Sequence, residues 1–127
     1  VIGPALGGIV LSYAVAAELG VRSIFSERKN GEMKIRRGFE LKAGEKVLVV
    51  EDVVTTGGSV KEVLQVLEEL DVEIVGLSSI VDRSNGKVEF NYDFKALLPV
   101  DIKSYKPGKC KLCKAGAAIT RPGSKEK

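Results

Sequence analysis

The stretch Val47-Leu48-Val49-Val50-Glu51-Asp52-Val53-Val54-Thr55-Thr56-Gly57-Gly58-Ser59 decides the fold of this chain. Together with Lys46, its first apolar residues predict a strand over residues 46–50 that is covered on both faces of a sheet. From residue 60 to residue 70 the apolar positions follow helical spacing, so we expect a helix to begin where the stretch ends. A strand, a polar loop and a helix are therefore expected in direct succession.

The loop between this strand and this helix combines glycines with hydroxyl side chains. Glycines let the backbone turn its N–H groups inward, and the positive end of the helix dipole points at the same place. The loop thus predicts a phosphate site made by Thr55, Thr56, Gly57, Gly58 and Ser59. Because carboxylates would repel a phosphate, Glu51 and Asp52 are expected to face vicinal sugar hydroxyls or a magnesium ion. Together these features predict a phosphorylated ribose ligand.

Two other interpretations account for parts of this stretch. Ser59 and Glu62 have the spacing of a capping box, which would account for both residues structurally. The acidic pair after an apolar strand is also compatible with a nucleoside triphosphatase, and segment 3–8 has two glycines at P-loop separation. However, Ile9 and Val10 stand where that loop needs Lys and Ser or Thr, which excludes a triphosphatase.

The rest of the chain predicts alternating helices and strands. Residues 9–19 are apolar except for Ser12 and Glu18, and predict a helix buried nearly all round that ends at Gly20. Strand character is found at 21–25 and 74–81, shorter strand-like pieces at 88–90 and 94–98, and a turn at Asn85-Gly86. Such alternation implies parallel strands with right-handed crossovers, and hence an α/β fold that binds ligands beyond the carboxyl ends of its strands.

The bulk properties limit the class of protein. With 127 residues, 44% hydrophobic and 29% charged, the chain is expected to be one soluble globular domain. No apolar run approaches the roughly 18 residues that cross a bilayer, and no basic leader precedes the first apolar stretch, so we expect a cytoplasmic protein without membrane contact. A net charge of +3 does not indicate nucleic-acid binding, and the absence of histidine excludes a Ser-His-Asp triad. Because Val1-Ile2 has the character of a strand end, the chain is expected to be the C-terminal portion of a longer protein.

The C-terminal part has a different composition. Residues 1–104 predict the core, and residues 105–127, rich in Lys, Gly and Pro, predict an irregular tail. Cys110 and Cys113 have the spacing of a metal knuckle, but one pair supplies only half of a tetrahedral zinc site, which a dimer could complete. No helix start is expected after them, which argues against a thioredoxin-type motif and favours reduced cysteines in a turn.

The stretch from Val47 to Ser59 resembles the phosphoribosyl pyrophosphate signature of the type I phosphoribosyltransferases. The wider context, from Gly3-Pro4-Ala5-Leu6-Gly7-Gly8 to Asp82-Arg83, is similar to the orotate phosphoribosyltransferases. The resemblance implies a Rossmann-like, mostly parallel sheet flanked by helices. It also implies transfer of the phosphoribosyl group of phosphoribosyl pyrophosphate to orotate, which yields orotidine 5′-phosphate and pyrophosphate in pyrimidine biosynthesis. The expected cofactor is Mg²⁺, held mainly through substrate and water rather than directly by the protein.

The resemblance assigns roles around the ribose phosphate. Glu51 and Asp52 would hold the ribose 2- and 3-hydroxyls and stabilise positive charge on the sugar, which makes them catalytic candidates. The loop around the 5-phosphate would comprise Val53, Val54, Thr55, Thr56, Gly57, Gly58 and Ser59, with Thr55 also near the base. The backbone of Ala5, Leu6 and Gly7 would bind pyrophosphate, although many family members have a lysine where Gly7 stands. The alternative for segment 3–8 is a strand-to-helix turn whose glycines serve packing.

A cationic hairpin over residues 28–38 is expected to act as a lid. Asn30-Gly31 predicts a type I′ turn, and the family uses such a lid to cover pyrophosphate, often in the neighbouring subunit of a homodimer. Many relatives carry a lid histidine that this chain lacks, so the role would fall on Arg28, Lys29 and Lys34, with Lys29 and Lys34 as catalytic candidates. The alternative is a solvated charged hairpin.

Arg83 is the residue on which the choice of base depends. The family's arginine at this position binds the carboxylate of orotate, and a guanidinium can bind a planar carboxylate through two N–H groups. The alternative is a loop ion pair with Asp82. Two other functions remain open: a purine phosphoribosyltransferase, and a non-catalytic sensor of phosphoribosyl pyrophosphate, although no DNA-binding module is visible. The resemblance also implies an N-terminal hood over the base, which we expect in the preceding part of the longer protein.

Overall fold

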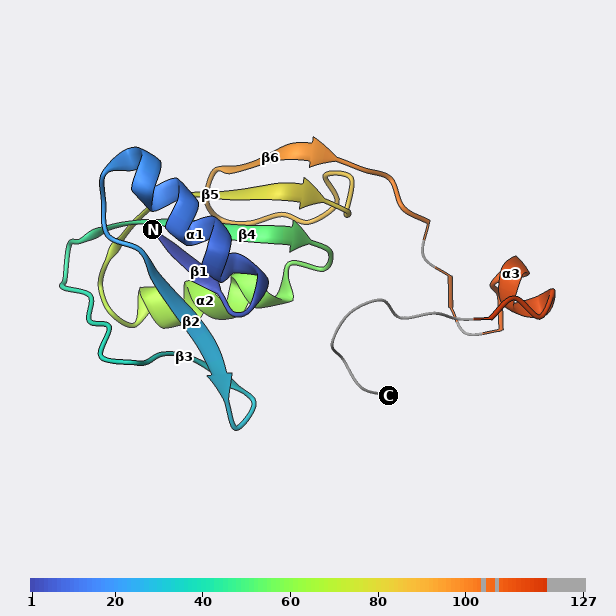
Figure 1. Cartoon of the computed structure of the whole chain (residues 1–127), viewed down its shortest axis with the longest axis horizontal. Helices are drawn as coiled ribbons and strands as arrows, with labels where there is room; N and C mark the ends of the chain where they lie inside the picture. The colour runs from blue at the N-terminus through green and yellow to red at the C-terminus, as the bar shows by residue number, and fades with distance from the viewer. Residues whose placement is uncertain (104, 107, 119–127) are drawn as a thin grey trace.

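The computed structural model describes residues 1–103, 105–106 and 108–118 of the chain. Figure 1 shows its elements, which in chain order are β1 (Ile2–Pro4), α1 (Gly7–Leu19), β2 (Ile24–Lys29), β3 (Glu32–Ile35), β4 (Lys46–Val54), α2 (Gly58–Glu68), β5 (Glu73–Asp82), β6 (Phe94–Pro99) and α3 (Lys111–Lys114). The predicted succession of strand, loop and helix is therefore confirmed for β4 and α2.

The strands form one six-stranded sheet in the order β3-β2-β1-β4-β5-β6. All neighbouring pairs are parallel except β2 and β3, which form an antiparallel hairpin at one edge. The parallel strands end at the same edge of the sheet, to which Figure 1 shows the arrowheads of β4, β5 and β6 pointing. The predicted α/β class is confirmed, and this edge is where the loop after β4 lies.

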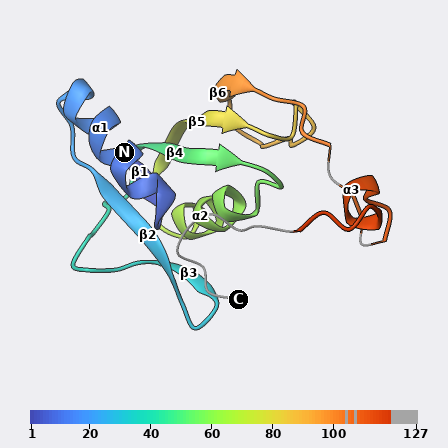
Figure 2. The same ribbon diagram turned by 45° about the vertical axis from the view of Figure 1, so that its right-hand side comes forward.

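Helices α1 and α2 cover opposite faces of the sheet (Figure 2). The main core lies under α2, whose side chains Val60, Val63, Leu64 and Leu67 are buried against Val47 and Val49 of β4. Burying one such side chain stabilises the fold by about 1.5–3 kcal/mol, so this layer fixes α2, and with it the loop, against the sheet.

Helix α1 corrects one prediction. It ends at Gly20 as expected, in the left-handed conformation, but it is not buried all round. Only Gly8, Ser12 and Ala16 are buried, whereas Val10 and Tyr13 are 75% and 68% exposed. The physical reason is that α1 packs with one side on the sheet, and no described element covers its other side.

Two strand boundaries also differ from the predicted ones. Strand β2 begins at Ile24 rather than Val21 and continues to Lys29, so the cationic segment is part of the sheet's edge hairpin. Residues 88–90 do not form a strand. They belong to the irregular crossover from β5 to the parallel strand β6, and Val88 and Phe90 pack against the core instead of pairing with a strand.

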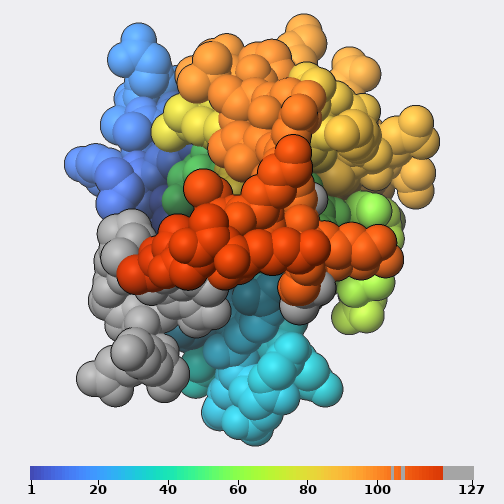
Figure 3. Space-filling view, turned by 90° about the vertical axis from the view of Figure 1, so that its right-hand side faces the viewer, coloured from blue at the N-terminus to red at the C-terminus, as the bar shows by residue number. Residues whose placement is uncertain are grey.

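The tail contains one short helical turn that was not predicted. Helix α3 begins directly after Cys110, which is its N-cap, so the expectation of no helix start is wrong. In Figure 3, which faces the edge where the strands end, this segment lies in front of the sheet, and Figure 1 shows it set apart from the strand tips. The predictions for residues 104, 107 and 119–127 lie outside the described residues, and the division at residue 104 stays a prediction. Within the described part of the chain, no helix is long and apolar enough to span a membrane.

Candidate functional site

The acidic pair lies inside strand β4 rather than after it. The strand continues to Val54, and its pairing with β5 includes Glu51 opposite Ser79. Because side chains alternate along a strand, Glu51 and Asp52 point to opposite faces. Glu51 lines the hollow of the loop on the α2 side, whereas Asp52 lies against Gly7 at the start of α1. The two carboxylates therefore frame the end of the strand from both sides.

The environments of the two acids differ. Glu51 is only 7% exposed, and burial, together with the neighbouring Asp52 carboxylate, raises the pKa of Glu51 to about 8. One oxygen of Glu51 accepts the backbone N–H of Asp52 at 3.2 Å. Asp52 is less buried and accepts the N–H of Val53 at 2.8 Å. At neutral pH the ligand-free site therefore holds a mostly protonated Glu51 beside Asp52.

The loop after β4 forms a small hollow of about 50 Å³, lined by Glu51 and by residues 53–60. Gly57 has a φ of 74°, a left-handed conformation that favours glycine, and it is the N-cap of α2. A Cβ at Gly57 would also lie 2.7 Å from Cγ1 of Val88. The residues predicted to bind phosphate thus surround one hollow at the N-terminus of an eleven-residue helix.

The capping-box interpretation of Ser59 and Glu62 is wrong. Because α2 begins after Gly57, Ser59 is already inside the helix, and in the described part of the chain no side chain caps α2. Ser59 Oγ accepts a hydrogen bond from Arg28 at 3.3 Å, and the Glu62 carboxylate binds the same guanidinium. Sequence reasoning missed this contact of Glu62 because it joins residues 34 positions apart.

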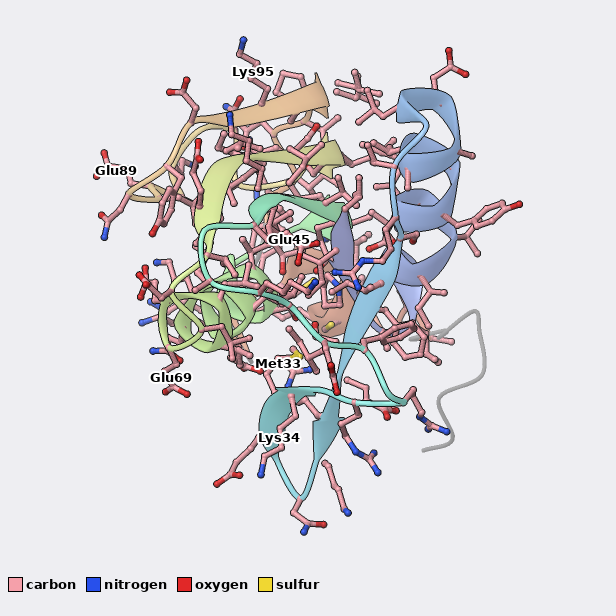
Figure 4. All side chains as sticks on the ribbon, turned by 90° about the vertical axis from the view of Figure 1, so that its left-hand side faces the viewer. Met33, Lys34, Glu45, Glu69, Glu89 and Lys95 are labelled. Atoms are coloured by element: carbon pink, nitrogen blue, oxygen red, sulfur yellow. The ribbon has the colours of Figure 1, made fainter. Side chains whose placement is uncertain are left out.

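The hairpin has the predicted turn at Asn30-Gly31, with φ values of 55° and 87°. Of its cations, Arg28 contacts the loop, whereas Arg36 and Arg37 both bind Glu27 on the other face of β2, at 2.9 and 2.8 Å. Lys34 binds Glu32 at 2.7 Å, and Figure 4 shows it projecting from the hairpin. The structure therefore brings Arg28 to the candidate site and leaves Lys34 away from it.

A larger groove separates the hairpin from α2. Its volume is about 1040 Å³, and Met33 and Phe39 on one side and Val66 and Leu70 on the other contribute its apolar lining. This groove lies beside the second half of α2, whereas the residues predicted to bind the ligand surround the N-terminus of that helix. Despite its size, this groove is therefore not the candidate ribose-phosphate site.

Segment 3–8 combines close packing with an exposed backbone. A Cβ at Gly3 would lie 2.3 Å from the carbonyl oxygen of Gly8, so the packing interpretation accounts for these two glycines. Leu6 and Gly7 between them are exposed. A Cβ at Gly7 would lie 2.1 Å from Oδ2 of Asp52. A lysine at position 7 would therefore require a different position of the Asp52 carboxylate.

Arg83 lies directly after β5, at the same edge of the sheet. Its backbone N–H donates to the carbonyl oxygen of Val54 at 2.8 Å, which ties it to the end of β4, and its side chain is exposed. The Asp82 carboxylate instead accepts the N–H groups of Ser84 and Gly86, at 2.8 and 2.9 Å. The alternative of an Asp82–Arg83 ion pair is therefore wrong for the described residues.

Comparisons with known proteins show the family of the chain. The phosphoribosyl transferase domain family matches residues 1–107. An orotate phosphoribosyltransferase of Thermotoga maritima is 57% identical over 125 residues, which are 98% of this chain and 67% of the relative. One of Caldanaerobacter subterraneus subsp. tengcongensis is 53% identical over 126 residues, 99% of this chain and 66% of the relative. The chain thus spans about two thirds of the length of these curated relatives.

Solved structures show the same fold. Adenine phosphoribosyltransferase from Thermoanaerobacter pseudethanolicus superposes with a TM-score of 0.68 at 18% identity, covering 78% of this chain and 68% of the other. Mycobacterium tuberculosis orotate phosphoribosyltransferase in complex with inorganic phosphate has a TM-score of 0.59 at 22% identity, covering 78% and 59%. The family match over residues 1–107 shows a phosphoribosyl transferase domain, and the fold agrees with it. At the identities of the sequence relatives, the chain belongs to the orotate phosphoribosyltransferase family.

Proposed function

We propose that this chain carries the site that transfers a phosphoribosyl group from phosphoribosyl pyrophosphate to orotate, in the cytoplasm. The support is the agreement of several relatives named orotate phosphoribosyltransferase, which are 53–57% identical over nearly the whole chain. The observation that carries the proposal is that Glu51, Asp52, the loop and Arg28 meet at one edge of the sheet. In the reaction, the bond between the anomeric carbon and pyrophosphate breaks, and a carbon–nitrogen bond to orotate forms.

In this proposal the loop after β4 holds the 5-phosphate. The backbone N–H groups at the start of α2 and the hydroxyls of Thr55, Thr56 and Ser59 are its donors, and the helix dipole favours an anion there. The hollow is lined by the segment 53–60 and is small, as suits a phosphate group rather than a base. Its role is to fix the sugar so that the anomeric carbon faces the base.

Glu51 and Asp52 hold the two ribose hydroxyls in this proposal. As pyrophosphate departs, positive charge develops on the sugar, and carboxylates fixed beside it stabilise that charge. Asp52 is the better candidate for this electrostatic role, because burial and the Asp52 charge keep Glu51 largely protonated in the free site, where its pKa is about 8. A protonated Glu51 can donate a hydrogen bond to a ribose oxygen.

Magnesium binds together with the pyrophosphate group in the proposal. Mg²⁺ prefers oxygen ligands and keeps several waters, and a partly protonated Glu51 is a poor direct ligand. Mg²⁺ would therefore be held through the substrate's phosphates and water, and would neutralise the charge of the leaving group. The exposed residues Leu6 and Gly7 would bind pyrophosphate, whereas the N–H of Ala5, also expected to bind it, donates to the carbonyl oxygen of Ser26 at 2.7 Å.

The hairpin 28–38 would close over pyrophosphate as a lid, with Lys29 and Lys34 as its mobile cations, and in a homodimer it would serve the neighbouring subunit. The exposure of Lys34 away from its own loop supports that arrangement. Leu6, just before α1, and Val10 and Tyr13 on the helix are exposed apolar side chains. They offer surface that a dimer could bury.

Orotate would bind between Thr55 and Arg83. Both side chains are exposed at the edge of the sheet, and the Arg83 guanidinium is not engaged by Asp82, so it is free to bind a carboxylate. Uracil lacks this carboxylate, and adenine does as well.

One experiment separates the candidate functions. Titration calorimetry of the full chain with phosphoribosyl pyrophosphate and Mg²⁺ tests the ribose-phosphate site, and a pyrophosphate-release assay then compares orotate, uracil and adenine. Release with orotate alone supports the proposal. Release with adenine would favour a purine enzyme, and binding without release from any base would favour a non-catalytic sensor.

A further inference from the structure

Arg28 is the hairpin side chain that contacts the phosphate loop, and Glu62 holds it there. The Arg28 Nε donates to Glu62 Oε2 at 2.8 Å, and its Nη2 donates to Glu62 Oε1 at 3.0 Å. The same Nη2 donates to Ser59 Oγ at 3.3 Å. The guanidinium of Arg28 thus links strand β2 to two residues of α2, Glu62 and Ser59, and Ser59 lines the hollow.

A count of donors shows what this arrangement leaves free. A guanidinium has five N–H groups, of which Nε carries one and Nη1 and Nη2 carry two each. The contacts to Glu62 and Ser59 use the hydrogen on Nε and both on Nη2, and no acceptor among the described residues takes the two on Nη1. Because Ser59 Oγ accepts from Arg28, its own hydrogen also remains to be donated.

We propose that Glu62 is a positioning residue for the phosphate site: it orients Arg28 so that Nη1 and the Ser59 hydroxyl are ready to donate to the ligand's anionic group. This inference rests on the proposed function, because it concerns the same ribose-phosphate site. A long cation that is already ordered loses less conformational freedom on binding, which strengthens binding without adding a contact. The bidentate geometry supplies this order, since two parallel hydrogen bonds fix the plane of the guanidinium.

The competing explanation is an ordinary surface ion pair. The side chains of Arg28 and Glu62 are 45% and 37% exposed, and exposed pairs contribute little to stability. A purely structural pair would therefore leave ligand binding unchanged when it is broken. A pair in which Glu62 merely competes with the ligand for Arg28 would give tighter binding without Glu62.

The test measures binding of ribose 5-phosphate and of phosphoribosyl pyrophosphate by calorimetry, with no turnover required. Glu62→Gln keeps the size of the side chain but cannot accept both N–H groups on two equivalent oxygens. We expect its Kd for both probes to rise about tenfold, as for the loss of a pre-ordered charged contact. The matched control is Glu69→Gln at the C-cap of α2, which removes the same charge far from the loop and without touching Arg28. Its Kd should stay within about twofold of that of the unmodified chain.

A double-mutant cycle shows whether Glu62 acts through Arg28. In an Arg28→Ala background, Glu62→Gln should add no further loss, because there is no guanidinium left to orient. Unchanged or tighter binding by Glu62→Gln, or an equal additional loss in the Arg28→Ala background, would overturn the inference. If the unmodified chain binds neither probe, the proposed function itself fails, whereas binding that is insensitive to Glu62 removes only the positioning role.

Discussion

The carboxylate of Asp52 lies against Gly7, so closely that a Cβ on that glycine would be 2.1 Å from Oδ2 of Asp52. This relationship joins the end of β4 to the start of α1, and so joins the acid proposed to face the ribose to the loop proposed to bind pyrophosphate. A side chain at position 7 would therefore require the Asp52 carboxylate to move.

Gly7→Ala should lower turnover much more than stability. The added methyl group can be accommodated only if the Asp52 carboxylate rotates away, and a displaced catalytic group costs about 10²-fold in rate. Steady-state kinetics and thermal unfolding of the same preparation measure the two effects. In an Asp52→Ala background, Gly7→Ala should add little, since the clash is gone. An equal loss in both backgrounds would show that Gly7 serves the loop independently of Asp52.

Asp52→Asn combined with Glu51→Gln should reduce kcat by about 10²- to 10³-fold while the chain remains folded, because the charge that stabilises the developing positive sugar is removed. The two substitutions are nearly isosteric, so circular dichroism should be unchanged. The pyrophosphate-release assay measures the rate. A variant with the full rate would refute the roles of both acids.

Stability should fall as the pH rises because of Glu51. Burial and the Asp52 carboxylate raise the pKa of Glu51 from its usual 4.5 to about 8 in the folded chain. Between these two pH values the folded chain binds more protons than the unfolded chain, so the free energy of unfolding decreases with pH through this range. One pKa unit corresponds to about 1.4 kcal/mol. Between pH 5 and 8 the free energy of unfolding of the unmodified chain should therefore fall by at least about 1 kcal/mol more than that of the Glu51→Gln variant.

Urea unfolding of both proteins at a series of pH values measures this difference. The Glu51→Gln variant is the control, because it keeps the other titratable residues and lacks only the titratable carboxyl group at position 51. Identical pH profiles for the two proteins would mean that Glu51 is ionised in the folded chain. Phosphoribosyl pyrophosphate binding adds a second readout, because contact of Glu51 with the ligand would change the number of protons bound.

Arg83→Ala should raise KM for orotate about tenfold or more and leave KM for phosphoribosyl pyrophosphate within about twofold, since a bidentate charged contact is lost only to the base. Stability should not change, because the side chain is exposed and its structural contact is made by the backbone N–H to Val54. Initial rates at varied concentrations of each substrate measure both constants. Equal increases would remove the assignment of orotate recognition to Arg83.

Several features of the fold follow from local sequence alone. The apolar run of β4, the glycine and hydroxyl loop and the spacing of α2 are visible without a structure, because each depends on neighbours in the chain. The turns at Asn30-Gly31 and Asn85-Gly86 belong to the same group, and the left-handed φ of each of these four residues agrees with the predictions. The resemblance to a known family likewise rests on one continuous signature, which the relatives bear out.

Tertiary packing decided what local pattern could not. The apolar composition of α1 does not show which side of the helix meets the sheet, so its exposure at Val10 and Tyr13 was missed. Ser59 and Glu62 have capping-box spacing in the sequence, but the helix begins at Gly58. Both side chains instead accept hydrogen bonds from Arg28 of strand β2. Residues 88–90 have strand-like composition, yet they pair with no strand, and Val88 and Phe90 pack against the core.

The sequence by itself determined the class of fold, the loop that forms the candidate anion site and the family, because these depend on residue types at short, fixed spacings. Only the tertiary structure decided that burial raises the pKa of Glu51, that the Asp52 carboxylate lies against Gly7, and that Glu62 binds Arg28 beside the loop. Burial, pKa and the partner of a charged side chain depend on segments far apart in the chain, whose distances in space no local pattern contains.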